Sequence, residues 1–264
     1  MNLELAGRHA LILGNSRGIG LATAQRLARE GCHVALHGRD EAALAAACDA
    51  VAAEGGPPAR AFAADLAEPD AVTALAGRAI AALGGLDILV VNTGHLLYGG
   101  LATVEDAAWR GAFDMVVMSA VRAVRASLPA LRAAPRGAAA IVFIGSASTR
   151  EPKLHLLSNT MRAAVAGLAK TLAQELAPDG IRVNTVAPGY VRTGRIAQRM
   201  EEMEATGISV PEVERAISGG APPLGRFGRA EEIADLVALL ASPRGGYVTG
   251  ATLAADGGQG RAVF

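Results

Sequence analysis

The chain has 264 residues, of which 51% are hydrophobic and 19% are charged. This composition indicates a folded protein with a sizeable core and argues against disorder. The formal net charge is zero and no basic block is present, which argues against binding to nucleic acid or to an acidic membrane. Only 3% of the residues are aromatic, so platforms for stacking bases are not expected either.

The N-terminus and the cysteines indicate the compartment. The opening "MNLELAGRHALILG" has no basic segment followed by an apolar signal core, and no apolar run is long enough to span a membrane. Cys32 and Cys48 lack the spacing of metal ligands, so we predict no metal site and two small buried or half-buried side chains in a reducing compartment. We therefore expect a soluble, cytoplasmic protein.

Short apolar runs alternate with longer amphipathic stretches along the chain. The runs predict strands at 9–14, 33–37, 59–64, 86–92, 139–146, 181–188 and 251–256. The stretches between them predict helices near 18–30, 41–54, 68–83, 104–133, 156–177 and 230–241. Most runs lack in–out alternation, as expected when both faces of a sheet are covered. We predict an α/β fold, a Rossmann-type doubly wound parallel sheet of about seven strands with helices on both faces.

We find no internal repeat or linker and expect one domain over residues 1–264. The segment 193–227 differs from the rest of the chain, because it is charged, ends in Gly and Pro residues and interrupts the strand–helix order. We predict that it forms a mobile helical lid.

The stretch "LGNSRGIG" follows the first predicted strand and begins the first predicted helix. Gly14 can turn tightly, Gly18 lets a pyrophosphate approach the backbone, and Gly20 allows close packing, while the helix N-terminus offers free N–H groups. A purely structural tight turn is the alternative. The predicted cofactor contacts in this loop are Gly14, Ser16, Arg17, Gly18, Ile19 and Gly20.

The end of the second strand bears on the choice of cofactor. An acidic residue there would bind the adenosine ribose of NAD, but Gly38 stands at this position and Arg39 follows it. Arg39 and Arg17 could hold a 2′-phosphate through charge-assisted hydrogen bonds, so we favour NADP(H) over NAD(H). The alternative is that both are solvated surface arginines.

The ends of the third and fourth strands supply further predicted cofactor contacts. Asp65, followed by Leu66, either lies at the adenine edge or caps the next helix. Asn92 and Gly94 close the fourth strand, where the backbone must pass near the nucleotide.

Together, "LGNSRGIG", "VNTGH", "VNTVAPGYVRT" and the C-terminal "GRAEEIADLVALLASPRGGYVTGATLAADGG" resemble the short-chain dehydrogenase/reductase family over nearly the whole chain. The resemblance implies that Pro188, Gly189 and Thr193 flank the nicotinamide. It also implies a homodimer or homotetramer through the helices at 104–133 and 156–177, although packing of these helices against the sheet alone is the alternative reading.

Members of this family use a Tyr-x-x-x-Lys pair, which the resemblance places in "LLSNTMRAAVAGLAK" at Ser158 and Arg162. Ser146 matches the serine that orients the substrate carbonyl, and Val116 occupies the usual Asn site. Arg162 keeps the positive charge and needs an acceptor, which could be the nicotinamide ribose, a substrate anion or the protein itself.

Without the family's tyrosine, the proton could be handled by water, by the substrate itself or by a histidine. His155 precedes the altered pair and His95 follows the fourth strand, and an imidazole, whose free pKa is roughly 6.5, can donate a proton near neutral pH. Each could equally be an exposed or hydrogen-bonded structural residue.

Two hypotheses follow. The first is an NADP(H)-dependent oxidoreductase, similar to a 3-oxoacyl reductase, that acts on a small carbonyl or alcohol substrate with a nonstandard proton donor. The second is a nucleotide-binding regulator or scaffold that has kept the fold and lost the chemistry.

Overall fold

The computed structural model describes residues 2–94, 96–97, 99–152, 155–205, 207–218 and 222–262. Seven parallel strands form one sheet in the order β3-β2-β1-β4-β5-β6-β7. This confirms the predicted fold class. The first and last residues of the seven strands differ from those predicted by no more than two positions. The strands are β1 (His9–Ile12), β2 (His33–Gly38), β3 (Arg60–Ala63), β4 (Ile88–Val91), β5 (Ala140–Ile144), β6 (Arg182–Pro188) and β7 (Thr252–Ala255).

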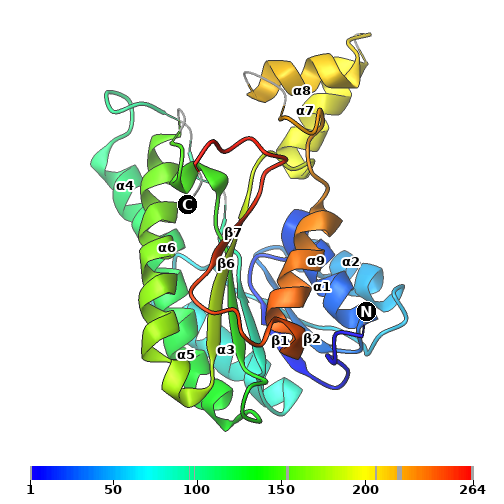
Figure 1. Ribbon diagram of the computed structural model, residues 1–264, viewed down its shortest axis with the longest axis vertical. Coiled ribbons are helices and arrows are strands. Elements are labelled where there is room, and N and C mark those ends of the chain that lie inside the picture. Colours follow the sequence, from blue (N-terminus) through cyan, green and yellow to red (C-terminus); the bar gives the residue numbers. More distant parts are fainter. Residues whose placement is uncertain are drawn as a thin grey trace.

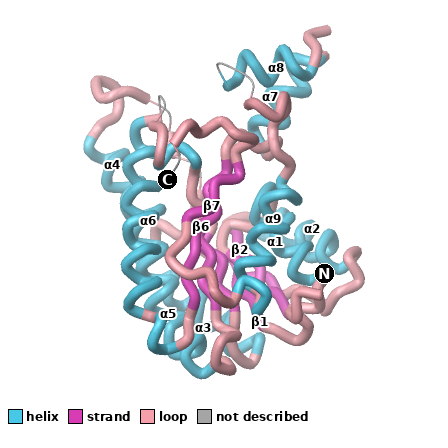
Figure 2. The backbone as a smooth tube through the Cα atoms, viewed as in Figure 1, coloured by secondary structure: helices cyan, strands magenta, loops and turns pink. Residues whose placement is uncertain are grey.

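Helices cover both faces of the sheet (Figures 1 and 2). One face packs against α1 (Gly18–Arg29), α2 (Glu41–Ala52) and α9 (Ala230–Ala241). The other packs against α3 (Pro69–Leu83), α4 (Asp106–Ala112), α5 (Ser119–Ala133) and α6 (Leu156–Glu175). Short 3₁₀ turns follow β5, α6 and α9, at Ala147–Thr149, Ala177–Asp179 and Pro243–Gly245.

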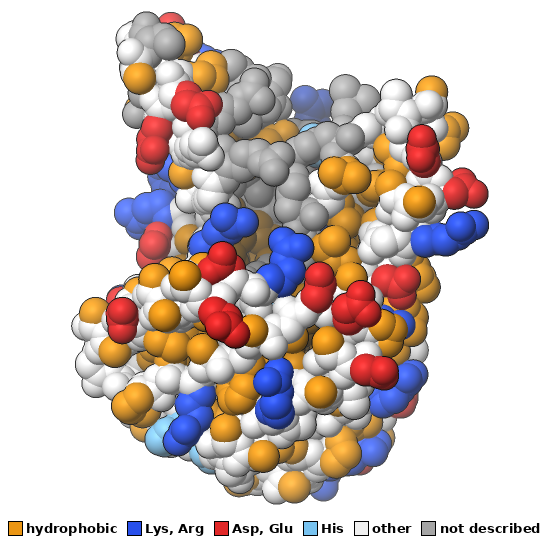
Figure 3. Space-filling view, turned by 180° about the vertical axis from the view of Figure 1, so that it is seen from behind, with side chains coloured by type: hydrophobic (Ala, Val, Ile, Leu, Met, Phe, Trp, Pro, Cys, Tyr) orange, Lys and Arg blue, Asp and Glu red, His pale blue; other side chains and the backbone are white. Residues whose placement is uncertain are grey.

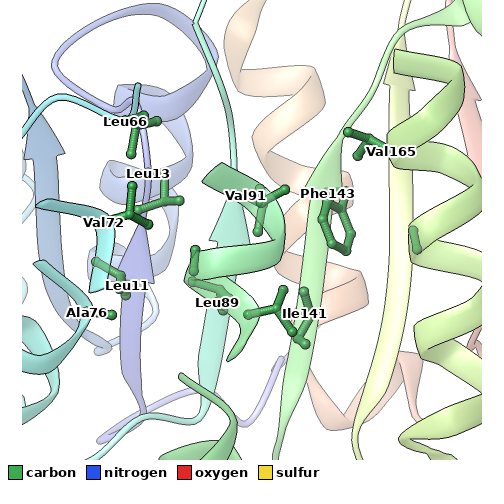
Figure 4. Close-up of a cluster of buried hydrophobic side chains, with 14 of the residues drawn as sticks. Leu11, Leu13, Leu66, Val72, Ala76, Leu89, Val91, Ile141, Phe143 and Val165 are labelled. Carbon is green, nitrogen blue, oxygen red and sulfur yellow. The ribbon is translucent and has the colours of Figure 1, made fainter. Parts of the chain in front are cut away.

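The side chains on the two faces of the central strands belong to two separate hydrophobic clusters. Alternate residues of β4, Leu89 and Val91, enter the cluster under α3, α5 and α6, whereas Ile88 and Val90 enter the cluster under α1 and α9. Because both faces are buried, these strands read as unbroken apolar runs in the sequence. Figure 4 shows the first cluster, with side chains from the strand regions and from α6 directed toward one another: Leu11, Leu13, Leu89, Val91, Ile141, Phe143 and Val165.

The region 104–133, predicted as helical, is helical from Asp106 to Ala133, but it is not a regular α-helix throughout. A π-helical segment, Phe113–Met118, separates α4 from α5. The Ser119 hydroxyl donates to the Met115 carbonyl at 2.5 Å, a side-chain bond that competes with the regular backbone ladder. Val116, fully buried, lies in this wide turn. π-Helical turns of this kind are frequent at functional sites.

The predicted lid segment contains α7 (Gly194–Glu204) and α8 (Val210–Ser218), which project beyond the carboxyl ends of the strands (Figure 1). It has a small core of its own, in which Met200, Val213 and Phe227 are buried. The buried carboxylate of Glu214 accepts hydrogen bonds from Arg192 Nη2 at 2.7 Å and Nε at 3.0 Å. The helical character agrees with the prediction, and the mobility of the segment stays a prediction.

Candidate active site

The strand order reverses at β1, whose neighbours are β2 and β4, and nucleotides bind such sheets at this reversal. The chain leaves β1 through Gly14, which has a φ of +59°. A Cβ at this position would lie 2.5 Å from the Asn92 carbonyl oxygen, so only glycine fits. Asn92 Nδ2 donates to the Gly14 carbonyl at 2.7 Å and ties the turn to the end of β4.

The other two glycines are also confined by close neighbours. Gly18, the first residue of α1, has a φ of +59°, and a Cβ there would lie 3.2 Å from the Cβ of Thr193. At Gly20 a Cβ would lie 2.3 Å from the Gly14 carbonyl oxygen. The first turn of α1 carries no acidic residue, so no carboxylate within that turn opposes an anion at its free N–H groups. Ser16 is half-buried beside this turn, and Ile19 packs on the core.

The predicted 2′-phosphate contacts lie near the end of β2. Gly38 is buried, and a Cβ there would lie 3.3 Å from the Ser16 Cβ, so β2 ends directly beside the glycine loop. Arg17 and Arg39 are both exposed, and neither side chain has a hydrogen bond or an ion pair to the rest of the described chain. Seen from behind, the molecule is hollowed below the lid helices, and Lys and Arg side chains lie along the lower rim of the hollow (Figure 3).

Asp65 and Leu66 follow β3 as predicted, with Asp65 exposed and Leu66 buried. Asp65 Oδ1 accepts from the Ala67 backbone N–H at 3.0 Å, whereas the N-cap residue of α3 is Glu68. The reading of Asp65 as the cap of the next helix was therefore wrong. Its contact with the adenine stays a prediction.

Three of the predicted catalytic residues line one cavity of about 110 Å³ at the carboxyl end of the sheet. Ser146 follows β5, His155 is the N-cap residue of α6, and Ser158 lies in the first turn of α6. The Oγ atoms of Ser146 and Ser148 are 2.8 Å apart, and Ser146 Oγ also accepts from the Ser148 backbone N–H at 3.2 Å. Pro188 and Gly189 complete the predicted set in the cavity wall. His95 lies outside the described residues.

The cavity wall also contains residues that the sequence analysis missed, because no motif marks them. Its two carboxylates both bind backbone N–H groups of the C-terminal segment. Glu151 Oε1 accepts from Arg261 and, at 2.9 Å, from Ala262. Asp256 accepts from Gly258 at 3.0 Å and from Gly260 at 2.8 Å. Figure 1 shows this segment crossing the top of the sheet from β7 toward α6.

Tyr190 is another wall residue without a predicted role. Its ring stacks on Phe227, with centroids 5.1 Å apart, and so joins the cavity to the small core of the lid segment. Thr193, predicted to flank the nicotinamide, is the N-cap residue of α7 and packs against Gly18.

Arg162, one turn along α6 from Ser158, is not among the described residues of the cavity wall. Its Nη1 donates to Thr93 Oγ1 at 3.0 Å and to the Ile144 carbonyl at 3.1 Å. Its Nη2 donates to the carbonyls of Thr93 and Gly94, both at 3.2 Å. Burial lowers the pKa of the guanidinium to about 10, so it stays protonated at neutral pH. The sequence analysis left three possible acceptors for Arg162: the nicotinamide ribose, a substrate anion and the protein itself. All four of these hydrogen bonds go to the protein itself.

Comparison with known proteins shows the family to which this fold and site belong. A family model described as Enoyl-(Acyl carrier protein) reductase matches residues 13–259. The chain belongs to the short-chain dehydrogenase/reductase family. The structure of L-sorbose reductase from Gluconobacter frateurii in complex with NADPH and L-sorbose is 32% identical, with a TM-score of 0.92 and coverage of 100% of both chains.

Two further solved structures with a bound nucleotide are similar to the chain. A 3-oxoacyl (acyl-carrier-protein) reductase from Agrobacterium tumefaciens C58 with NADP bound is 34% identical, with a TM-score of 0.88 over 97% of this chain and 96% of that one. An NADPH-bound short-chain oxidoreductase from Pseudomonas aeruginosa PAO1, described as containing an atypical catalytic center, is 33% identical, with a TM-score of 0.88 over 97% of this chain and 98% of that one.

The described residues contain neither a metal-ligand cluster nor a helix suited to span a membrane. No group of His, Cys, Asp and Glu side chains there is arranged to hold a metal ion. Within the same residues, no helix combines the length and the apolar character that a membrane span requires.

Proposed function

We propose that this short-chain dehydrogenase/reductase is an NADP(H)-dependent oxidoreductase that acts on a small carbonyl or alcohol substrate, in the manner of a 3-oxoacyl reductase. The observation that carries the proposal is the cavity in which Ser146, Ser158 and His155 meet beside the turn after β6. The names of the relatives support the reaction class, since they include reductases with NADP or NADPH bound.

The choice of NADP(H) depends on two features at the end of β2. Gly38 replaces an acidic residue that would repel a 2′-phosphate, and the exposed Arg17 and Arg39 keep their donors available for it. The confined glycines at 14, 18 and 20 leave room for a pyrophosphate at the N-terminus of α1. Residues 65, 66, 92 and 94 complete the proposed contacts.

When bound, NADP(H) supplies the chemistry of hydride transfer. Ser146 then holds the substrate oxygen by a hydrogen bond, and the Ser148 hydroxyl, 2.8 Å from Ser146, fixes the orientation of its O–H group. Ser158 leaves the space of a tyrosine open and helps to position the substrate.

We assign to His155 the role of exchanging a proton with the substrate oxygen. The other titratable side chains of the described cavity wall are each engaged elsewhere: Glu151 and Asp256 accept from backbone N–H groups of the C-terminal segment, and the Tyr190 ring stacks on Phe227. An imidazole at the N-cap of α6 can exchange a proton with the substrate oxygen directly or through water. His95, water and the substrate itself are the other sources to be tested.

Arg162 acts in this proposal as a positioning residue. Its bonds to Thr93, Gly94 and Ile144 fix the carboxyl ends of β4 and β5, beside the segment that carries Ser146. Its charge also favours negative charge that develops nearby during reduction.

The decisive experiment measures NADPH oxidation by the purified chain with a panel of ketones, ketoses and 3-oxoacyl thioesters. Substrate-dependent oxidation supports the proposal. Tight NADPH binding without turnover of any compound would instead support a nucleotide-binding regulator. Size-exclusion chromatography with light scattering tests the accompanying expectation of a homodimer or homotetramer.

A further inference from the structure

A buried histidine lies next to the nucleotide turn and has no part in the chemistry proposed above. His37, in β2, has 2% of its surface exposed. Its Nδ1 accepts a hydrogen bond from the Gly14 backbone N–H at 3.0 Å, and its Nε2 lies 3.1 Å from the Ala64 carbonyl oxygen. The ring therefore joins the turn after β1 to the end of β3.

The backbone of His37 is bonded to the same turn. Its N–H donates to Asn15 Oδ1 at 2.7 Å, and its carbonyl accepts from the Asn15 N–H at 3.0 Å. Gly14 is thus held on both of its backbone groups, its N–H by His37 and its carbonyl by Asn92. These two side chains set the position of the first glycine of the loop.

The bonding pattern defines the protonation state of the ring. Nδ1 accepts from an N–H, so it carries a lone pair, and Nε2 faces a carbonyl, so it carries the hydrogen. This is the neutral imidazole. Protonation would place a second hydrogen on Nδ1, directly opposite the Gly14 N–H, and would break that bond.

The surroundings favour the neutral form. Burial lowers the pKa of His37, and the positive charge of Arg39 lowers it further, while the Ala64 carbonyl and the charge of Asp65 act in the opposite direction. Because the folded pKa lies below the free value, the ring is neutral at and above about pH 6.5. The bond to Gly14 is lost only as the pH falls through the lowered value.

We infer that His37 is a positioning residue of the nucleotide site and that its protonation in acid weakens the binding of NADP(H) by releasing the Gly14 turn. The inference rests on the proposed function, since it takes the glycine loop as the NADP(H) site.

The test is calorimetric titration with NADP⁺, which is stable in acid, from about pH 8 down to the lowest pH at which wild type stays folded. His37→Leu removes the acceptor for Gly14. His37→Asn keeps an acceptor, because Asn Oδ1 is as many bonds from the backbone as Nδ1, and it cannot titrate. His33→Asn, at the exposed start of the same strand, is the matched control. The 2′-phosphate itself titrates near pH 6, so variants are compared with wild type at each pH.

At about pH 8 we expect His37→Leu to bind NADP⁺ about tenfold more weakly than wild type and His37→Asn to bind within about threefold. Toward the acid end of this range, wild type and His33→Asn should lose more affinity than His37→Asn does. Parallel pH profiles of wild type and His37→Asn would overturn the inference, even if His37→Leu failed to fold. Absence of any binding by wild type at pH 8 would refute the proposed function and this inference with it.

Discussion

Arg162 and Thr93 are joined twice: Arg162 Nη1 donates to the Thr93 hydroxyl at 3.0 Å, and Nη2 donates to the Thr93 carbonyl at 3.2 Å. The planar guanidinium can make both bonds and still reach Ile144 and Gly94. A lysine carries its three donors on one atom and cannot span these acceptors together. The arginine on α6 is therefore an integral part of the frame around the site.

This arrangement predicts that Arg162→Ala lowers the free energy of unfolding by about 2 kcal/mol, because three carbonyls lose their donor. For a chain of this size the melting temperature should fall by roughly 4–8 °C. Thermal unfolding followed by circular dichroism measures the change. Arg136→Ala, at an exposed arginine after α5, should melt as wild type does. Equal melting temperatures for Arg162→Ala and Arg136→Ala would mean that the network contributes nothing.

The second prediction concerns cofactor choice. Arg39→Ala should weaken NADPH binding by roughly 10–100-fold and leave NADH binding nearly unchanged, since charge-assisted hydrogen bonds to the 2′-phosphate are lost. Gly38→Asp should reverse the preference, because its carboxylate can accept from ribose hydroxyls and repels the phosphate. Fluorescence titration with both cofactors checks this, with Arg60→Ala on β3 as the control. A similar loss for both cofactors would exclude a 2′-phosphate role for Arg39.

The third prediction concerns the C-terminal segment. Glu151→Ala removes the acceptor for the N–H groups of Arg261 and Ala262, and so frees the segment that carries the wall residues Gln259 and Gly260. We expect KM for the substrate to rise about fivefold or more, because ordering the freed segment would cost about 1 kcal/mol when the substrate binds. NADPH affinity should be unchanged, because this cost falls on substrate binding alone. Steady-state kinetics measures both. Glu175→Ala, at the exposed end of α6, is the matched control. An unchanged KM would show that the segment does not shape the pocket.

The fourth prediction concerns the thiols. Burial, helped by the charges of Asp87 and Glu30, raises the pKa of Cys32 to about 12, and its Sγ donates to the Leu5 carbonyl. At about pH 8 the folded chain should therefore keep Cys32 unreactive toward a thiol reagent, with about one thiolate in ten thousand. Half-buried Cys48 should react slowly, and both should react on unfolding. Mass spectrometry measures the number of labelled thiols in the folded and the unfolded chain. As the control, Cys32→Ser should leave the labelling of the folded chain unchanged. Rapid native labelling of Cys32 would contradict its burial.

The sequence predicted the sheet well because strand and helix periods differ strongly and glycine-rich turns mark their ends. It missed the π-helical turn around Val116, because one extra residue in a turn barely changes an apolar pattern. It also missed Glu151 and Asp256, whose partners are backbone N–H groups of residues that form no motif.

The hydrogen-bond partners of buried polar side chains also could not be predicted from the sequence. The acceptors of Arg162 come from the ends of two strands, β4 and β5, and only the fold brings them to α6. In the same way, His37 reads as one polar residue in an apolar run until β2 is placed beside the glycine turn. Residue type indicated the need for a partner, and the three-dimensional arrangement supplied it.

The most direct test of the central claim is the rate of NADPH oxidation by wild type, Ser146→Ala and Ser148→Ala with the best substrate of the panel. We expect a fall of about 100-fold or more for Ser146→Ala, because a hydrogen bond to the reacting oxygen is lost, with a smaller fall for Ser148→Ala and unchanged NADPH affinity in both. Equal rates for wild type and Ser146→Ala would contradict the assignment of this cavity as the active site.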